Sequence, residues 1–150
     1  MGEGRKRFFQ YVAQDSTQLH SHVVRVFKED YGPQDPVDAQ RIVKGSVHFH
    51  AHVLLPIGSK LKTWKKLGPA PAPQKLEVLF RATDDAGRRA GDPQVRKSNS
   101  WFVWRIDGDH QVVGELPSKY HHAEIGAVVP PDSLVFRMRH DRYDFFYPDF

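Results

Sequence analysis

Three histidines stand at alternate positions in one short segment of the sequence: His48, His50 and His52. The residues between and beside them are apolar: Val47, Phe49, Ala51 and Val53. A period of two predicts a β-strand over 46–55, with the histidines on one face and the apolar residues in the core. Side chains two positions apart on a strand lie roughly 6.5–7 Å apart, so neighbouring imidazoles can reach one ion or one phosphate.

Two kinds of chemistry suit such a row. Neutral imidazole binds zinc, copper, manganese and iron, so His50 and His52 are candidate ligands of a divalent metal ion, a cofactor that the sequence suggests but does not require. Imidazoles also act as acids, bases or nucleophiles at a phosphorus centre, so His48, His50 and His52 are candidate catalytic residues. The alternative is a strand whose outward face is rich in histidine without chemistry, and the sequence leaves both open.

A second pair of histidines follows later in the chain. His121 and His122, with Glu124 close behind them, could complete a metal site with the strand histidines, because the ligands of one metal can come from separate elements. A polar loop without a metal is the alternative, and we favour it.

A basic segment follows the predicted strand. Residues 60–67 are predicted to form a short helix, in which Trp64 is surrounded by four lysines: Lys60, Lys62, Lys65 and Lys66. Lysines beside an aromatic ring are typical of a surface that contacts phosphates and stacks on bases. Lys62, Lys65 and Lys66 are therefore candidate phosphate-binding residues. The alternative, which we favour, is a solvated helix face with Trp64 turned inward.

The run 45–54, Gly-Ser-Val-His-Phe-His-Ala-His-Val-Leu, resembles the signature of the histidine-triad nucleotide hydrolases and transferases. The resemblance is confined to this run. It implies that His50 attacks the α-phosphate of a nucleotide, that His48 and His52 flank it, and that Ser46 lies near the leaving group as a phosphate-binding residue.

The run 49–55 also resembles the metal strand of the HUH endonucleases, in which histidine, a hydrophobic residue and histidine are followed by further hydrophobic residues. This second resemblance implies that His50 and His52 hold a divalent metal ion. It also implies a tyrosine nucleophile, for which Tyr120, with Lys119 beside it, is the candidate.

The elements that must position these residues follow from periodicity and turn signals. Strands are predicted over 7–13, 46–55, 76–82, 101–106, 111–116, 125–129 and 134–138. Asp107 and Gly108 predict that the strands over 101–106 and 111–116 form a hairpin. Helices are predicted after a cap at Asp15 or Ser16 as far as Tyr31, over 37–44 after Asp35, and over 60–67. The pattern predicts an α+β or mainly β single domain over residues 1–150. A curved, mostly antiparallel sheet or small barrel of about seven strands would carry two or three short helices.

Composition limits the function classes. The chain of 150 residues contains no cysteine, which excludes disulfides and thiolate metal sites. Its net charge of +4 favours an anionic partner: a nucleotide, a nucleic acid or an acidic protein. No segment approaches the ~20 apolar residues of a membrane helix, so we expect no membrane partner and a cytoplasmic location. The sequence does not determine the oligomeric state.

The histidine row favours a phosphate-directed protein, one that performs nucleotide or nucleic-acid phosphodiester chemistry with or without a metal. Two alternatives remain open: a non-catalytic interaction module of the adaptor, immunity or regulatory type, and a nucleic-acid-binding domain without chemistry. An active site requires that the three histidines line a concave pocket with another polar group opposite them.

Overall fold

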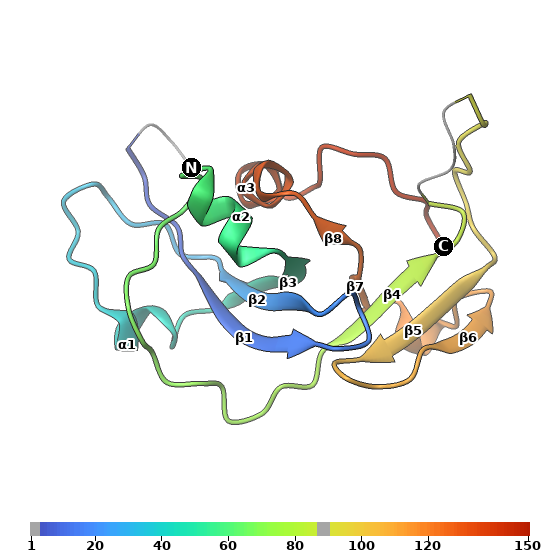
Figure 1. Cartoon of the computed structure of the whole chain (residues 1–150), viewed down its shortest axis with the longest axis horizontal. Helices are drawn as coiled ribbons and strands as arrows, with labels where there is room; N and C mark the ends of the chain where they lie inside the picture. The colour runs from blue at the N-terminus through green and yellow to red at the C-terminus, as the bar shows by residue number, and fades with distance from the viewer. Residues whose placement is uncertain (1–3, 87–90) are drawn as a thin grey trace.

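The computed structural model describes residues 4–86 and 91–150, whose strands form two separate sheets (Figure 1). The first sheet has the order β1-β2-β3-β8: β1 (Phe9–Asp15), β2 (Ser21–Phe27), β3 (Val47–Val53) and β8 (Val128–Val129). The second has the order β6-β5-β4-β7: β6 (Gln111–Gly114), β5 (Trp101–Arg105), β4 (Leu79–Thr83) and β7 (Glu124–Ile125). Both sheets are mixed, because β8 runs parallel to β3 and β7 runs parallel to β4.

The α+β class and the single small domain are confirmed, but the single curved sheet or barrel is not what forms. The chain passes from the second sheet to the first between β7 and β8, each of which is only two residues long. Gly126 lies at this crossing, where its N–H donates to the carbonyl of Arg81 at 2.8 Å. The strands form two open sheets and not one closed surface.

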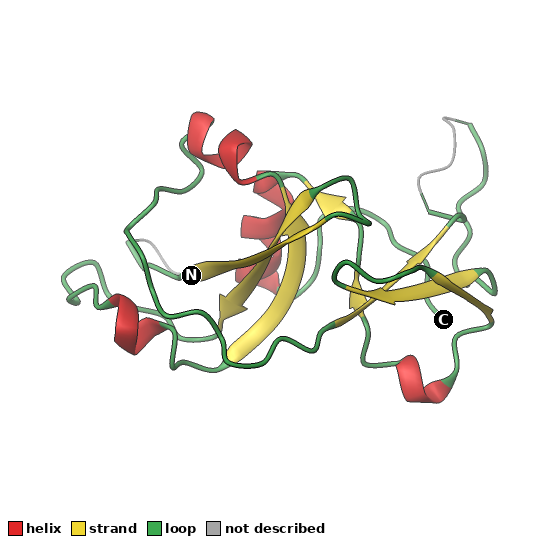
Figure 2. Ribbon diagram, turned by 60° about the horizontal axis from the view of Figure 1, so that its bottom comes forward, coloured by secondary structure: helices red, strands yellow, loops and turns green. Residues whose placement is uncertain are grey.

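Three α-helices and one 3-10 helix accompany the sheets in the described residues (Figure 2). They are α1 (Ala39–Ile42), α2 (Leu55–Lys60), the 3-10 helix η1 (Ser118–Tyr120) and α3 (Pro131–His140). The Asp38 carboxylate caps α1 by accepting from the N–H groups of Gln40 and Arg41. None of these helices is long and apolar enough to cross a bilayer.

The first core lies between the first sheet and α3. Leu134 and Met138 are one helical turn apart on α3 and pack against residues of β2 and β3. Of the four apolar residues predicted to face the core, Phe49, Ala51 and Val53 are buried here. The fourth, Val47 at the start of the strand, is 38% exposed. The strand prediction for 46–55 is therefore confirmed by β3.

The second core lies on both faces of the second sheet. The hairpin predicted around Asp107 and Gly108 is confirmed, since β5 and β6 are antiparallel. Trp101 and Trp104 point to opposite faces of β5, and neither ring is available for stacking. They are 0% and 2% exposed, because Trp101 is covered by the C-terminal tail and Trp104 by the first sheet.

The helix predicted after Asp15 is wrong. Residues 21–27 form β2. Val24 and Val26 are buried in the core with α3, and Val23 is buried against residues of the second sheet, so both faces are covered and apolar residues need not alternate. Their spacing happens to match a helical period. The turn before β2 contains Leu19 and His20 with φ values of 56° and 52°, a left-handed conformation that ends any helix here.

Two other predicted elements are also wrong. The strand predicted over 134–138 is part of α3, which begins at Pro131, because proline is favoured in the first turn of a helix. The helix predicted over 60–67 is displaced toward the N-terminus and forms α2. It stops after Lys60, and Lys62 adopts a φ of 58°.

Candidate functional site

The three strand histidines lie in three different environments along β3. His52 is fully buried at the end of the strand that faces the second sheet, and its ring packs on Phe80 with the centroids 4.1 Å apart. His50 is half-buried in the middle of the strand. The side chain of His48 is 17% exposed and lies at the other end of the strand. The three rings therefore do not share one pocket.

His52 belongs to a buried hydrogen-bond network. Its Nε2 lies 2.9 Å from Oδ2 of Asp15, and both side chains are 0% exposed. The same oxygen accepts from Nε1 of Trp104 at 3.0 Å, and the other oxygen accepts from Thr17 and from the N–H of Asp107. Because a carboxylate only accepts, Nε2 of His52 carries the proton.

The protonation states of this network are fixed by its surroundings. Burial alone would raise the pKa of Asp15, but the hydrogen bonds from His52, Thr17, Trp104 and the Asp107 amide together hold it far below its usual range. Burial lowers the pKa of His52 in spite of the carboxylate beside it. The pair is an ionised aspartate and a neutral histidine of the first sheet, and the hydrogen bond from Trp104 of β5 to Asp15 joins it to the second sheet, which is a structural role.

His50 is a poor acid or base at neutral pH. Burial, and then the nearby Arg25 guanidinium, lower the pKa of His50 to about 4. A general base works best when its pKa is close to the operating pH. The backbone N–H of His50 donates to Oε1 of Glu124 at 3.2 Å, so the strand is tied to β7 at this point.

His48 borders a pocket. Its Nε2 lies 2.7 Å from Oδ1 of Asp141, a residue that leaves α3 in a left-handed conformation with a φ of 58°. The pocket has a volume of about 470 Å³ and is lined by Arg7, Lys28, His48 and Asp141. A histidine oriented by a carboxylate is an arrangement that can move protons.

Of the two cationic side chains that line this pocket, Arg7 is already hydrogen-bonded to other residues, whereas Lys28 is exposed. Nε of Arg7 donates to Oδ1 of Asp30 at 2.9 Å, and its Nη1 donates to the carbonyl of Met138 near the end of α3. The pocket thus offers one exposed lysine, a committed arginine and the His48–Asp141 pair.

The structure does not bring the predicted metal ligands together. His121 is exposed. Its Nε2 lies 3.1 Å from the carbonyl oxygen of Leu116, and its ring packs on Phe150. His122 is exposed as well. Within residues 4–86 and 91–150, no group of three or more histidine, aspartate or glutamate side chains could hold a metal ion. The reason is that His50 and His52 are on the first sheet, whereas His121 and His122 follow η1 beside the second.

The predicted phosphate-binding residues also separate. Ser46 lies at the start of β3, where its N–H donates to Oε1 of Glu29 at 2.8 Å. Lys62, Lys65 and Lys66 come after α2, beyond the other end of β3, and all three are exposed. Ser46 and the lysines therefore belong to different parts of the surface.

The indole of Trp64 is turned toward the protein, in agreement with the inward orientation that we favoured from the sequence. Its Nε1 donates to the carbonyl of Leu55 at 3.2 Å, and its ring meets Phe9 edge to face with the centroids 5.1 Å apart. Gly58 makes this packing possible, because a Cβ there would lie 2.0 Å from the ring. The lysines around Trp64 thus surround a partly buried ring that packs inward, not a stacking platform.

Sequence reasoning missed a buried charged cluster beside β7. Oε2 of Glu124 accepts from Nη2 of Arg137 at 3.5 Å, and the Arg137 guanidinium stacks over Phe49 at 4.0 Å. Burial raises the pKa of Glu124 even though Arg137 opposes this shift. The cluster joins α3 to both sheets, and no periodic or spacing signal in the sequence points to it.

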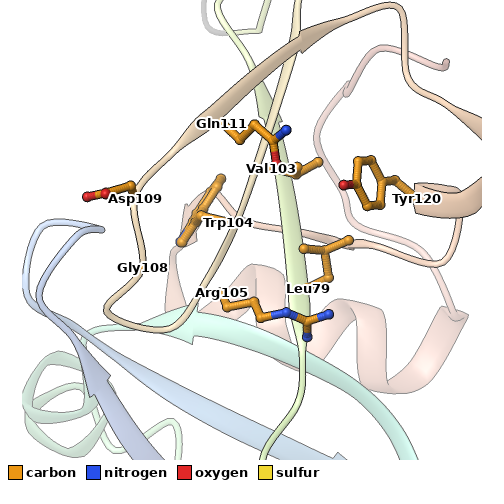
Figure 3. A pocket seen from close by; sticks show the side chains of 8 residues that line it. All are labelled: Leu79, Val103, Trp104, Arg105, Gly108, Asp109, Gln111 and Tyr120. Atoms are coloured by element: carbon orange, nitrogen blue, oxygen red, sulfur yellow. The ribbon is translucent and has the colours of Figure 1, made fainter.

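A second pocket lies beside the β5–β6 hairpin, with a volume of about 300 Å³ (Figure 3). Its wall is mainly apolar, with Tyr120 pointing across it toward Val103. The rim carries both Arg105 and Asp109, so it has no preference for one sign of charge. Tyr120, the candidate nucleophile, thus lines a pocket of the second sheet, away from the strand that carries His50.

Comparison with known proteins does not assign the chain to a family. A scan against protein-family models found no match, and searches of curated proteins and of solved structures found none either. The two local resemblances at the histidine strand therefore have no support beyond their own residues.

Proposed function

We propose that this protein is a binding module for an anionic partner, and that the contact surface is the basic segment after β3. The observation that carries the proposal is the concentration of charge there. Between Asp38 and Glu77 the sequence contains no acidic residue. Six exposed lysines lie within that interval, and four of them are close together in the sequence and form what we call the basic patch: Lys60, Lys62, Lys65 and Lys66.

The basic patch carries a large share of the positive charge that the chain has in excess. The sequence has 22 Lys and Arg against 18 Asp and Glu, a net charge of +4. Some cations elsewhere are paired with carboxylates, as Arg7 is with Asp30 and Arg137 is with Glu124. A local excess of one sign attracts a partner of the other sign and speeds its association.

A charge-matched comparison tests this proposal. Changing all four lysines of the basic patch to glutamine should weaken binding to heparin and to a labelled single-stranded oligonucleotide at low salt by about tenfold or more. The control changes four exposed lysines elsewhere, Lys44, Lys75, Lys97 and Lys119, to glutamine. Fluorescence anisotropy at several salt concentrations gives both affinity and salt dependence. Equal weakening in the two variants would show that net charge alone is responsible and would reject the patch.

Phosphodiester chemistry is the second candidate function, and the His48–Asp141 pair favours it. The two side chains are 2.7 Å apart beside a pocket that also contains Lys28 and Arg7. Here His48 would act as the general base, Asp141 would orient its ring, and Lys28 would contact the phosphate. His50 and His52, the other two members of the row, would support the strand.

This candidate predicts a particular order of variants. In a screen of phosphodiesters and nucleotides, His48→Ala should lower the hydrolysis rate by about 10²–10⁴-fold, and Asp141→Asn should lower it less. His50→Ala should retain activity at neutral pH. Elemental analysis of the purified protein, carried out beside the screen, shows whether a metal accompanies the activity. A wild-type rate equal to that of His48→Ala would remove this candidate.

A further inference from the structure

We infer that the basic patch docks on the surface of an anionic lipid bilayer, an inference that rests on the proposed function and names its partner. The decisive feature is that the lysines do not stand alone. Large aliphatic side chains are exposed among them: Leu54 at 37%, Ile57 at 43%, Leu61 at 62% and Leu67 at 49%. A cluster of exposed apolar side chains marks a surface that meets another apolar phase.

Three of these aliphatic residues share one side of α2. Leu54 is the N-cap residue, Ile57 is in the helix and Leu61 is the C-cap residue with helical backbone angles. Spacings of three and four residues place them on the same helical face. Gly58 lies next to these residues on the helix surface and is buried against Trp64. The three aliphatic side chains stay exposed and form what we call the aliphatic row (Leu54, Ile57 and Leu61).

The position of α2 leaves this row accessible. In two views of the molecule α2 lies at an outer edge, beyond α3 and away from the second sheet (Figures 1 and 2). The segment after it runs along the surface and carries the remaining lysines. A flat surface such as a bilayer can therefore reach the row and the lysines together.

The side-chain types distinguish a bilayer from a nucleic acid. A nucleic-acid surface gains from aromatic rings that stack on bases, but the only aromatic ring of the segment, Trp64, is held inward by Phe9 and the Leu55 carbonyl. Aliphatic side chains flanked by lysines are instead typical of segments that lie in the interface of an anionic bilayer. There the aliphatic groups enter the acyl region and the ammonium groups remain with the lipid phosphates.

The expectation of no membrane partner came from the lack of a segment that could span a bilayer. Docking on the surface needs no such segment. It needs apolar contact area together with opposite charge, because either alone gives weak attachment. The basic patch and the aliphatic row supply both within 54–67.

Sedimentation with lipid vesicles tests this inference on the full chain. We expect binding to vesicles of phosphatidylcholine mixed with phosphatidylserine, little binding to pure phosphatidylcholine, and release by salt. The double variant Ile57→Ser with Leu61→Ser should bind the anionic vesicles at least about tenfold more weakly, while it binds heparin and the oligonucleotide as the wild type does. The matched control is Leu19→Ser with Val112→Ser, two aliphatic residues that are 80% and 83% exposed elsewhere. This control should bind vesicles normally.

The outcomes separate the two proposals. If the double variant Ile57→Ser with Leu61→Ser binds anionic vesicles as tightly as the wild type does, the aliphatic row is not the docking surface. Oligonucleotide binding through the lysines, without any binding to anionic vesicles, overturns the lipid partner but keeps the anion-binding module. If vesicles, heparin and oligonucleotide all fail to bind the wild type, both proposals fall. Circular dichroism of each variant confirms that the fold is kept.

Discussion

Replacing Asp15 by asparagine will lower the free energy of unfolding by about 3 kcal/mol, since it leaves buried donors without an acceptor. This is a large fraction of the total for a small domain, which is typically about 5–15 kcal/mol. Asp15 is 0% exposed and accepts hydrogen bonds on both oxygens from both sheets. Equilibrium unfolding in urea, followed by tryptophan fluorescence, measures the change.

The size of the effect follows from the donors around the carboxylate. One oxygen faces Nε1 of Trp104, and the other faces the N–H groups of Thr17 and Asp107. None of these groups can accept a hydrogen bond. Whichever way the asparagine amide is turned, its NH₂ meets at least one of them. Asp15→Ala should cost more, about 3–5 kcal/mol, because it removes both acceptors from a buried network.

The control for this prediction is Asp107→Asn. Asp107 is exposed, with a left-handed backbone that asparagine tolerates, and its carboxylate accepts from Ser16 at the surface. We expect the change to stay within about 1 kcal/mol. If Asp15→Asn proves as mild as Asp107→Asn, the Asp15–His52 network does not join the sheets as described.

The change Gly126→Ala will destabilise the protein by about 1–3 kcal/mol or more through a steric clash at the crossing between the sheets. A Cβ at this position would lie 2.2 Å from Cη2 of Trp104 and 3.1 Å from Cβ of Phe80. Both aromatic residues are essentially buried, so neither ring has room to withdraw. Thermal unfolding monitored by circular dichroism measures the loss.

A second substitution identifies the cause. Trp104→Phe removes the ring atoms that the new methyl group would meet, although it also loses the hydrogen bond to Asp15. The double variant Gly126→Ala with Trp104→Phe should therefore lose less stability than the sum of the two single losses, because the residues are in contact. Simple additivity would mean that Gly126 is needed for a reason other than space for Trp104.

Patterns among neighbouring residues were sufficient to predict some of the strands and turns. The alternation around His50 predicted β3 and its buried apolar face, and the Asp107–Gly108 pair predicted the β5–β6 hairpin. Both depend on neighbours within a few residues. The same patterns predicted the wrong element twice. β2 was taken for a helix, because both of its faces are covered and its apolar residues do not alternate, and residues 134–138 of α3 were taken for a strand.

Some features of the candidate site could be predicted from the sequence, and others could not. The lysines of the basic patch and the absence of acids around them are properties of the sequence, as is the inward-facing alternative for Trp64. That three histidines share one face of β3 was also readable from the sequence. Their separate partners were not, because Asp15, Glu124 and Asp141 come from β1, β7 and the end of α3.

The sequence by itself therefore determined the strand that carries the histidines, the hairpin and the place where positive charge gathers. Only the tertiary structure decided what each histidine meets, because carboxylates distant in the chain are brought to β3 by the packing of two sheets and α3. It also decided that Trp64 packs against Gly58 of α2 and that the aliphatic residues of that helix stay exposed.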